Sequence, residues 1–347
     1  MPTDLPSIAP EIIAQAPCRV DLAGGTMDLW PLYLFHPGAV TVNFAVNVFA
    51  RCKIKRLQGR KIRLISRDGG LRELYSNLAE LCACKPKHAL ASNLTRFFAP
   101  PDGFEIETHS ESPVGAGISG SSALMIATTA ALARLTGREI EPEKMREIAQ
   151  NVEAQVINVP TGCQDYYPAL YGGVNAIHLA PDGIHRQAIH VDADELDRRF
   201  VLAYTGAPRQ SGINNWKVFQ AHINGDHKVF RNFECIGEIA RAMHKALDEA
   251  DWEDIARLLR EEWKLRKTNA PRITTPAIDR LINVARRNGA LAAKVCGAGG
   301  GGCVVFLCQP EARQRVAEAV AGHGGQVLPA RVAREGLTVS ERPESIS

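Results

Sequence analysis

The feature that most restricts the fold is a glycine run in the C-terminal part of the chain, K-V-C-G-A-G-G-G-G-C at residues 294–303. Five of the six residues from 297 to 302 are glycine, and this composition supports neither a stable helix nor a stable strand. Apolar stretches lie on both sides, which indicates two buried strands joined by a turn. Either the turn is simply sharp and buried, or something else closely approaches its main chain.

A second glycine-rich stretch, S-P-V-G-A-G-I-S-G-S-S-A-L at 112–124, stands directly before a helix-forming run. Its three glycines have G-x-G-x-x-G spacing, and the N–H groups at the start of a helix favour an anion such as phosphate. Its serines add hydroxyls that can bind phosphate oxygens or a metal ion. A dinucleotide loop, a triphosphate loop and a plain turn capped by serine are all compatible with this spacing.

Two features disfavour the dinucleotide loop of a redox enzyme. The strand expected at 104–108 alternates apolar and polar residues, whereas a dinucleotide loop usually follows a fully buried strand. The acidic residues about twenty positions further on, Glu139 and Glu141, fall in a short turn between two expected helices. The other common phosphate loop, G-x-x-x-x-G-K-[ST], does not occur in the sequence.

The order of the expected elements indicates an α+β protein with two domains, 1–190 and 191–347. A strand-rich beginning leads into a pair of helices and then into a half that mixes helices with strands. Residues 1–14 are expected to form a loose lead-in. The expected strands are 19–23, 39–55, 60–75 with a turn at 68–70, 104–108, 174–179, 200–205 and 294–307 around the glycine run. The expected helices are 76–98, 121–136, 142–157 and 276–288, and the region 211–268 is dominated by helical periodicity.

Charged residues gather around a Gly-Gly turn near the N-terminus. Arg19, Asp21 and Asp28 lie in Q-A-P-C-R-V-D-L-A-G-G-T-M-D-L-W-P at 15–31. Such residues can form part of a polar site. A solvated charge on a strand and an ordinary turn aspartate are equally good interpretations of Arg19 and Asp28 in isolation.

A further group of polar residues follows the second of the paired helices. Glu153 stands on a helix whose other members are largely apolar, and Gln164 and Asp165 follow a P-T-G turn among aromatic residues. Carboxylates in apolar surroundings are candidates for general bases. The alternative for Asp165 is a capping residue of a short helix at 166–171.

Bulk properties exclude several classes of protein. A net charge of +3 over 347 residues, without a Lys/Arg block, argues against a nucleic-acid partner. No apolar run has the length of a membrane helix, and the N-terminus lacks the pattern of a secretory signal. The nine cysteines form no C-x-x-C pair, so we expect reduced thiols in a cytoplasmic protein. Cys82, Cys84 and His88 lack a matching second ligand cluster and are not expected to bind a metal.

Three motifs, in order, resemble those of the GHMP kinases, the family of galactokinase, homoserine kinase, mevalonate kinase and phosphomevalonate kinase. They are A-P-C-R-V-D-L-A-G-G-T-M-D at 16–28, P-V-G-A-G-I-S-G-S-S-A at 113–123 and K-V-C-G-A-G-G-G-G at 294–302. The most similar branch is the sugar kinases related to D-glycero-D-manno-heptose 7-phosphate kinase, through A-G-G-T-x-D, T-G-x-Q-D-x-Y before Y-G-G, and Y-T-G-x-x-R-x-S at 204–211. The resemblance implies an N-terminal domain like ribosomal protein S5 domain 2 and a ferredoxin-like C-terminal domain, with ATP in the cleft between them.

The resemblance also implies a role for each candidate residue. Asp165 would orient or deprotonate the acceptor hydroxyl, and Arg19 beside it would stabilise charge on the transferred phosphoryl group. Glu153 and Ser122, with Ser121 as the near alternative, would hold Mg²⁺. The residues implied to bind the ATP phosphates are Gly115, Ala116, Gly117, Ser119, Gly120, Ser121 and Ser122, and those implied to bind the substrate are Asp28, Gly25, Gln164, Gly299 and Gly300.

The implied activity is transfer of the γ-phosphoryl group of ATP to a hydroxyl of a sugar or sugar phosphate, with the anomeric hydroxyl of a heptose 7-phosphate as the nearest analogue. Galactose, fucose or a uronic acid stay open as acceptors, and so does a non-catalytic member that binds a sugar or nucleotide. The sequence departs from the family at Ser119, where G-x-G-L-G is usual, and at Met27, where the sugar branch more often has G-G-G-T-D. Asn214, Asn215 and Trp216 receive no assignment.

Overall fold

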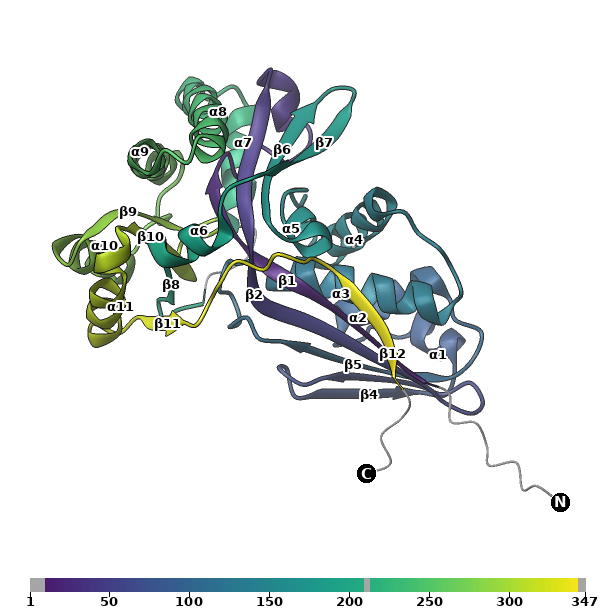
Figure 1. Cartoon of the computed structure of the whole chain (residues 1–347). Coiled ribbons are helices and arrows are strands. Elements are labelled where there is room, and N and C mark those ends of the chain that lie inside the picture. Colours follow the sequence, from purple (N-terminus) through teal and green to yellow (C-terminus); the bar gives the residue numbers. More distant parts are fainter. Residues whose placement is uncertain (1–9, 209–212, 343–347) are drawn as a thin grey trace.

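Two sheets organise the structure, a computed structural model that describes residues 10–208 and 213–342 (Figure 1). Within these residues the larger sheet has eight strands in the order β12-β1-β2-β5-β3-β4, with β6 beside β2 and β7 beside β6. The pairing of β3 with β5 is parallel and the other pairings are antiparallel. The strands are β1 (Glu11–Ala23), β2 (Ala39–Arg56), β3 (Ile62–Ser66), β4 (Leu71–Tyr75), β5 (Phe104–Ser110), β6 (Val174–Ala180), β7 (Gly183–Ile189) and β12 (Thr338–Arg342).

The long strand β2 gives this sheet its shape. Its C-terminal part, Ala50–Arg56, pairs with β5, and its N-terminal part, Ala39–Phe44, pairs with β6. β1 runs alongside β2 with two shifts of register, one at Pro17/Cys18 and one at Asp21/Ala23. Because such irregularities bend a strand, β1 carries Arg19 and Asp21 at the place where the sheet changes direction. Figure 1 shows the two strands passing from one lobe of the molecule into the other.

A nearly fully buried helix, α3, lies against β1 and β2. Its alanine-rich sequence gives small or apolar groups on all faces, which a helix covered on every side requires. α2 and α4 pack against it, so α3 holds its N-terminus in a fixed place inside the first domain. The helices of this part are η1 (Leu32–Phe35), α1 (Leu78–Ala83), α2 (Ala89–Phe98), α3 (Gly120–Leu135), α4 (Pro142–Ile157) and α5 (Tyr166–Tyr171).

The smaller sheet has four antiparallel strands in the order β11-β8-β10-β9 among the residues described. Its strands and the helices α10 and α11 follow one another as in a β-α-β-β-α-β ferredoxin-like unit, with further helices inserted after β8. The remaining elements are α6 (Ala193–Arg199), β8 (Phe200–Tyr204), α7 (Ile213–Ile223), α8 (His227–Asp248), α9 (Trp252–Asn269), α10 (Pro276–Arg287), β9 (Ala290–Val295), β10 (Cys303–Cys308), η2 (Pro310–Ala312), α11 (Arg313–Gly322) and β11 (Gln326–Leu328).

Several element boundaries differ from the sequence-based expectation. The helix expected at 76–98 is two helices, because Pro86 follows the end of α1 and disfavours helical backbone before it. Within the region expected to be helical, the described residues from 213 onward form three helices, and Asp226 and Asp251 cap the second and third. The expected lead-in is wrong in its last residues, since β1 begins at Glu11.

The last strand returns to the first sheet. β12 pairs with β1, so residues 338–342 belong to the larger sheet although they follow the smaller one in sequence. The division at residue 190 stays a prediction. Residues 209–211 of the Y-T-G-x-x-R-x-S motif lie outside the described residues. No helix in the described part of the chain combines the length and the apolarity that crossing a bilayer requires.

Candidate active site

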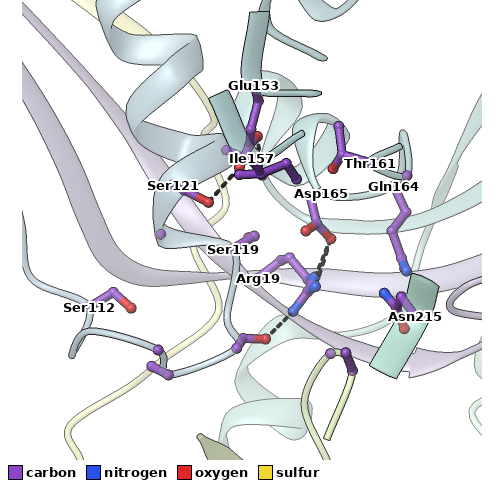
Figure 2. Close-up of a pocket in the computed structure, with 18 of the residues that line it drawn as sticks. Arg19, Ser112, Ser119, Ser121, Glu153, Ile157, Thr161, Gln164, Asp165 and Asn215 are labelled. Carbon is purple, nitrogen blue, oxygen red and sulfur yellow. Dashed lines mark hydrogen bonds and ion pairs between the residues drawn. The ribbon is translucent and has the colours of Figure 1, made fainter. Parts of the chain in front are cut away.

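A cavity of about 410 Å³ gathers almost all the residues selected from the sequence. The seven predicted phosphate-binding residues at 115–122, here called the phosphate loop, line it together with Arg19, Asp28, Glu153 and Asp165. Gly25 and Gln164 line it as well. In Figure 2, the Arg19 side chain extends from β1 to the carboxylate of Asp165, which lies in the segment before α5. The Glu153 side chain extends from α4 toward Ser121.

The phosphate loop leaves the start of α3 without a cap. The backbone has positive φ at Gly115 (69°), Gly117 (76°) and Ser119 (62°). Ser119 occupies the N-cap position, but its hydroxyl donates to the carbonyl of Ile118 at 2.6 Å and no side chain caps the helix. The interpretation of this stretch as a serine-capped turn is therefore wrong. The first N–H groups of α3 lie at the cavity, where they favour an anion.

Glu153 is buried on α4 and is surrounded by hydroxyl groups. Ser121 Oγ donates to its Oε1 at 2.6 Å, Ser122 Oγ to its Oε2 at 3.0 Å, and the Tyr166 hydroxyl to Oε2 at 2.6 Å. Burial raises the pKa of this carboxyl, and the hydroxyls counteract that effect in part. A carboxylate with hydroxyl neighbours suits Mg²⁺, which prefers oxygen ligands and usually binds through one or two carboxylates together with waters and phosphates.

Arg19 connects Asp165 with the phosphate loop. Its Nε and Nη2 lie 2.8 and 2.7 Å from Asp165 Oδ1, and its Nη1 donates to the carbonyl of Gly117 at 2.6 Å. Burial alone would lower the pKa of Arg19, but Asp165 and Asp21 outweigh it and raise that pKa, so the guanidinium stays charged. Asp165 precedes α5 without making a capping bond, so its interpretation as a helix cap is wrong. The Asp165 side chain, 21% exposed, opens to the cavity.

Asp28 lies buried beneath the segment that carries Gln164. Its Oδ2 accepts from the backbone N–H of Gln164 at 2.9 Å, and its Oδ1 accepts from Gln164 Nε2 at 3.4 Å. Burial raises the pKa of Asp28 to about 6, and the charge of Asp165 adds to the rise. A Cβ at Gly162 would stand 1.9 Å from Asp28 Oδ2, so the T-G-x-Q-D sequence requires glycine at that position.

The glycine turn 297–302 supports the phosphate loop with its main chain. A Cβ at Gly302 would stand 2.6 Å from the carbonyl oxygen of Ala116, and the N–H of Cys303 donates to the same carbonyl at 2.6 Å. Gly300 donates to the carbonyl of Ile273 at 2.8 Å. The close approach expected from the glycine content is therefore made by other backbone segments. Gly297 and Ala298 line the cavity, whereas Gly299 and Gly300 do not, and their contact with substrate stays a prediction.

Sequence reasoning did not select several residues at or behind the cavity. Tyr166 completes the hydroxyl cluster around Glu153. Asn215, at the start of α7, lines the cavity and accepts a hydrogen bond from Thr26 Oγ1 at 3.1 Å. Asp21 had no role, although its (i, i+2) spacing from Arg19 on a strand places both on one face. Lys294, Glu262 and Arg266 continue the buried charges behind it.

The possible cysteine–histidine site has a simpler explanation. His88 Nε2 hydrogen-bonds to Thr108 Oγ1 at 2.9 Å, and Cys82 and Cys84 are exposed. In the described ranges, no group of three or more His, Cys, Asp or Glu residues has an arrangement that could hold a metal ion.

Comparison with known proteins identifies the family. The model of the GHMP kinases N terminal domain matches residues 83–173, and that of the GHMP kinases C terminal matches residues 243–326. A D-glycero-alpha-D-manno-heptose 7-phosphate kinase of Campylobacter jejuni is 26% identical over 344 residues, which covers 94% of this chain and 98% of that protein. A mevalonate kinase of Pyrococcus horikoshii is 30% identical over 250 residues, 69% of each chain.

Solved structures show the same fold. A D-glycero-D-manno-heptose 1-phosphate kinase from Bacteriodes thetaiotaomicron superposes with a TM-score of 0.75 at 24% identity, covering 95% of this chain and 98% of the other. Lactococcus lactis galactokinase superposes with a TM-score of 0.77 at 18% identity, covering 94% and 95%. The predicted two-domain α+β GHMP kinase fold is confirmed. With both family models matched in order and the resemblance extending over nearly the whole chain, this protein belongs to the GHMP kinase family and is a kinase.

Proposed function

We propose that this kinase transfers the γ-phosphoryl group of ATP to a hydroxyl of a sugar or sugar phosphate, with the anomeric hydroxyl of a heptose 7-phosphate as the first candidate. The observation that carries the proposal is the position of Arg19, which contacts both Asp165 and the carbonyl of Gly117. One guanidinium thus joins the acceptor side of the cavity to the phosphate side. The similarity to a heptose 7-phosphate kinase over 94% of this chain supports the acceptor class.

On the acceptor side, Asp165 orients the hydroxyl and receives its proton, and Arg19 fixes the carboxylate in place. Phosphoryl transfer depends on positioning and on charge stabilisation more than on covalent catalysis by the protein. The buried guanidinium of Arg19 provides fixed positive charge next to the phosphate loop, where the transferred group gains negative charge.

On the phosphate side, the uncapped start of α3 and the loop from Gly115 to Ser122 bind the ATP phosphates. Glu153 and Ser122, with Ser121 as the alternative, would hold Mg²⁺, since they offer one carboxylate and hydroxyl oxygens beside the loop. Bound there, Mg²⁺ supplies positive charge to the phosphates.

At the other end of the cavity, Asp28, Gly25 and Gln164 bind the hydroxyls of the acceptor. The carboxylate of Asp28 accepts hydrogen bonds and the amide of Gln164 both donates and accepts, a combination that suits a polyhydroxylated molecule. We place the activity in the cytoplasm, because the nine cysteines, all of them within the described residues, form no disulfide bond with one another.

An assay of ADP formation across free sugars, sugar phosphates and mevalonate tests the proposal, with NMR to locate the new phosphate. Asp165→Ala is expected to lower kcat about 10²- to 10⁴-fold while ATP binding stays largely intact, since a general base contributes on that order. Asp182→Ala, in an exposed hairpin turn away from the cavity, is the matched control. Near-normal turnover by Asp165→Ala would show the mechanism to be wrong. ATP binding without turnover of any acceptor would instead indicate a non-catalytic member.

A further inference from the structure

Behind Arg19, buried charged side chains of alternating sign connect the two sheets. Asp21 lies two residues after Arg19 on β1, and Lys294 lies on β9 of the smaller sheet. Glu262 and Arg266 lie one helical turn apart on α9. Each of the five is at most 4% exposed.

Asp21 stands between Arg19 and Lys294. Its Oδ1 is 3.5 Å from Arg19 Nη1 and accepts from the backbone N–H of Gly297 at 2.8 Å. Its Oδ2 forms a short ion pair with Lys294 Nζ, which also donates to the backbone carbonyl of Asp21 at 3.2 Å. The carboxylate therefore ties β1 both to the lysine and to the first residue of the glycine turn.

The row of charges continues from Lys294 to the substrate end of the cavity. Lys294 Nζ lies 3.8 Å from Glu262 Oε2, and Glu262 Oε1 accepts from Arg266 Nε at 2.8 Å and Nη2 at 2.6 Å. Arg266 Nη2 donates to the carbonyl of Gly25 at 2.9 Å. The same network thus contacts the catalytic arginine at one end and the acceptor-binding loop at the other.

The burial of Lys294 distinguishes its role from that of a ligand-binding lysine. It is completely buried and does not line the cavity, so its ammonium group does not reach ATP or acceptor. Burying an ammonium is unfavourable unless carboxylates compensate it, and here Asp21 does so at hydrogen-bond distance. An ion pair of this kind acts on the reaction through the residues that it holds.

We propose that Asp21 and Lys294 form a positioning pair for phosphoryl transfer, fixing Arg19 against Asp165 and anchoring the glycine turn that supports the phosphate loop. This inference rests on the proposed function. Asp21 is the second carboxylate beside the Arg19 guanidinium, and its removal leaves only Asp165 and the carbonyl of Gly117 to hold that group in place. A displacement of about 1 Å in a catalytic group can cost on the order of 100-fold in rate.

The test separates positioning from simple stability. Asp21→Asn/Lys294→Met removes both charges with little change in volume, so the double variant is expected to melt near the wild-type temperature. We expect its kcat to fall about 100-fold, with a much smaller change in the KM for ATP. Glu11→Gln/Lys53→Met is the matched control, because it removes a β1–β2 ion pair at the far end of the same strand. This control is expected to retain wild-type kcat.

The outcomes distinguish the two proposals. A double variant with wild-type kcat per folded molecule overturns the positioning role. Wild-type protein that is inactive toward every acceptor refutes the proposed function instead. Asp21→Asn alone serves where the double variant does not fold, since Lys294 then retains Glu262 as a counterion. Its kcat per folded molecule is expected to fall similarly, and an unchanged value counts equally against the positioning pair.

Discussion

Two sets of buried carboxylates occupy one site and differ in how their charge is balanced. Asp21 and Glu262 stand between the cationic groups of Arg19, Lys294 and Arg266. Asp28 and Glu153 are just as buried but are bound by amide and hydroxyl groups, and neither forms an ion pair with another described residue. Asp21, Asp28 and Glu153 all line the cavity, but only the first set connects the two sheets, through the ion pair of Asp21 with Lys294.

The pKa values of Asp21, Asp28 and Glu153 follow that difference. Burial would raise the pKa of Asp21, but Lys294 and Arg19 outweigh it and hold the pKa well below its usual range. Burial raises the pKa of Asp28 to about 6 and also raises that of Glu153, because no paired cation compensates either group. Asp21 therefore stays ionised beside its cations, whereas Asp28 and Glu153 carry charge that a substrate hydroxyl or a metal ion can use.

The largest expected effect on stability comes from removing one charge of the Asp21–Lys294–Glu262 group. Lys294→Met leaves Asp21 and Glu262 without the cation that separates them, and removing one partner of a buried pair costs roughly 3–5 kcal/mol. Urea unfolding at pH 7.5 measures this as a lower free energy of unfolding. The double variant Asp21→Asn/Lys294→Met is expected to recover most of that loss. If the single variant is as stable as the double one, the two charges do not depend on each other.

Asp28→Asn is expected to raise the free energy of unfolding, whereas Lys294→Met lowers it. With a folded-state pKa of about 6 against a usual 3.8, the folded protein binds more protons than the unfolded chain between these values. Stability therefore falls as the pH rises through this window, and at pH 7.5 the cost is about 3 kcal/mol. Asparagine retains a carbonyl oxygen to accept from Gln164 and carries no charge, so the variant should be more stable than wild type while binding the acceptor more weakly.

The pH dependence is the decisive measurement for Asp28→Asn. Urea unfolding of variant and wild type at pH 7.5 and pH 4.5 should show a gain that shrinks to about 1 kcal/mol at the lower pH. Asp21→Asn, the same substitution seven residues earlier, is the control and should destabilise the protein at pH 7.5. A gain from Asp28→Asn that is equal at both pH values would mean that charge burial is not its cause.

Three carboxylates that line the cavity could be selected from the sequence. Asp28 and Asp165 lie within short motifs, Glu153 lies on a helix expected to be largely apolar, and the geometry brings all three to one cavity with Arg19. The ion pairs of the balanced set could not be predicted, because they join residues far apart in the sequence. Lys294 and Asp21 are 273 positions apart, and Glu262 lies on an ordinary amphipathic helix. Only the folded chain shows which charges neutralise each other.

The elements show the same limit on prediction. The helix expected at 142–157 agrees with the structure to the residue, and the strands expected at 104–108 and 174–179 agree to within two residues. The pairing of β12 with β1 joins the two ends of the chain and has no local signature in an exposed five-residue strand. The glycine turn was correctly expected between two strands, but its partner Ala116 lies almost two hundred residues earlier, so the sequence could not show which backbone segment packs against the turn.

The smallest expected effect concerns Glu153, where hydroxyl groups offset part of the cost of burial. Because burial raises its pKa, Glu153→Gln should stabilise the metal-free protein at pH 7.5, by less than Asp28→Asn, since three hydroxyls already donate to this carboxylate. Adding Mg²⁺ with a non-hydrolysable ATP analogue should make the wild-type protein more stable than Glu153→Gln, because a ligand stabilises the form that binds it more tightly. Thermal unfolding with and without Mg²⁺ checks this, with Glu147→Gln on the exposed face of α4 as the control. Equal Mg²⁺-dependent gains in wild type and Glu153→Gln would remove Glu153 from the metal site and leave its negative charge without an identified counterion.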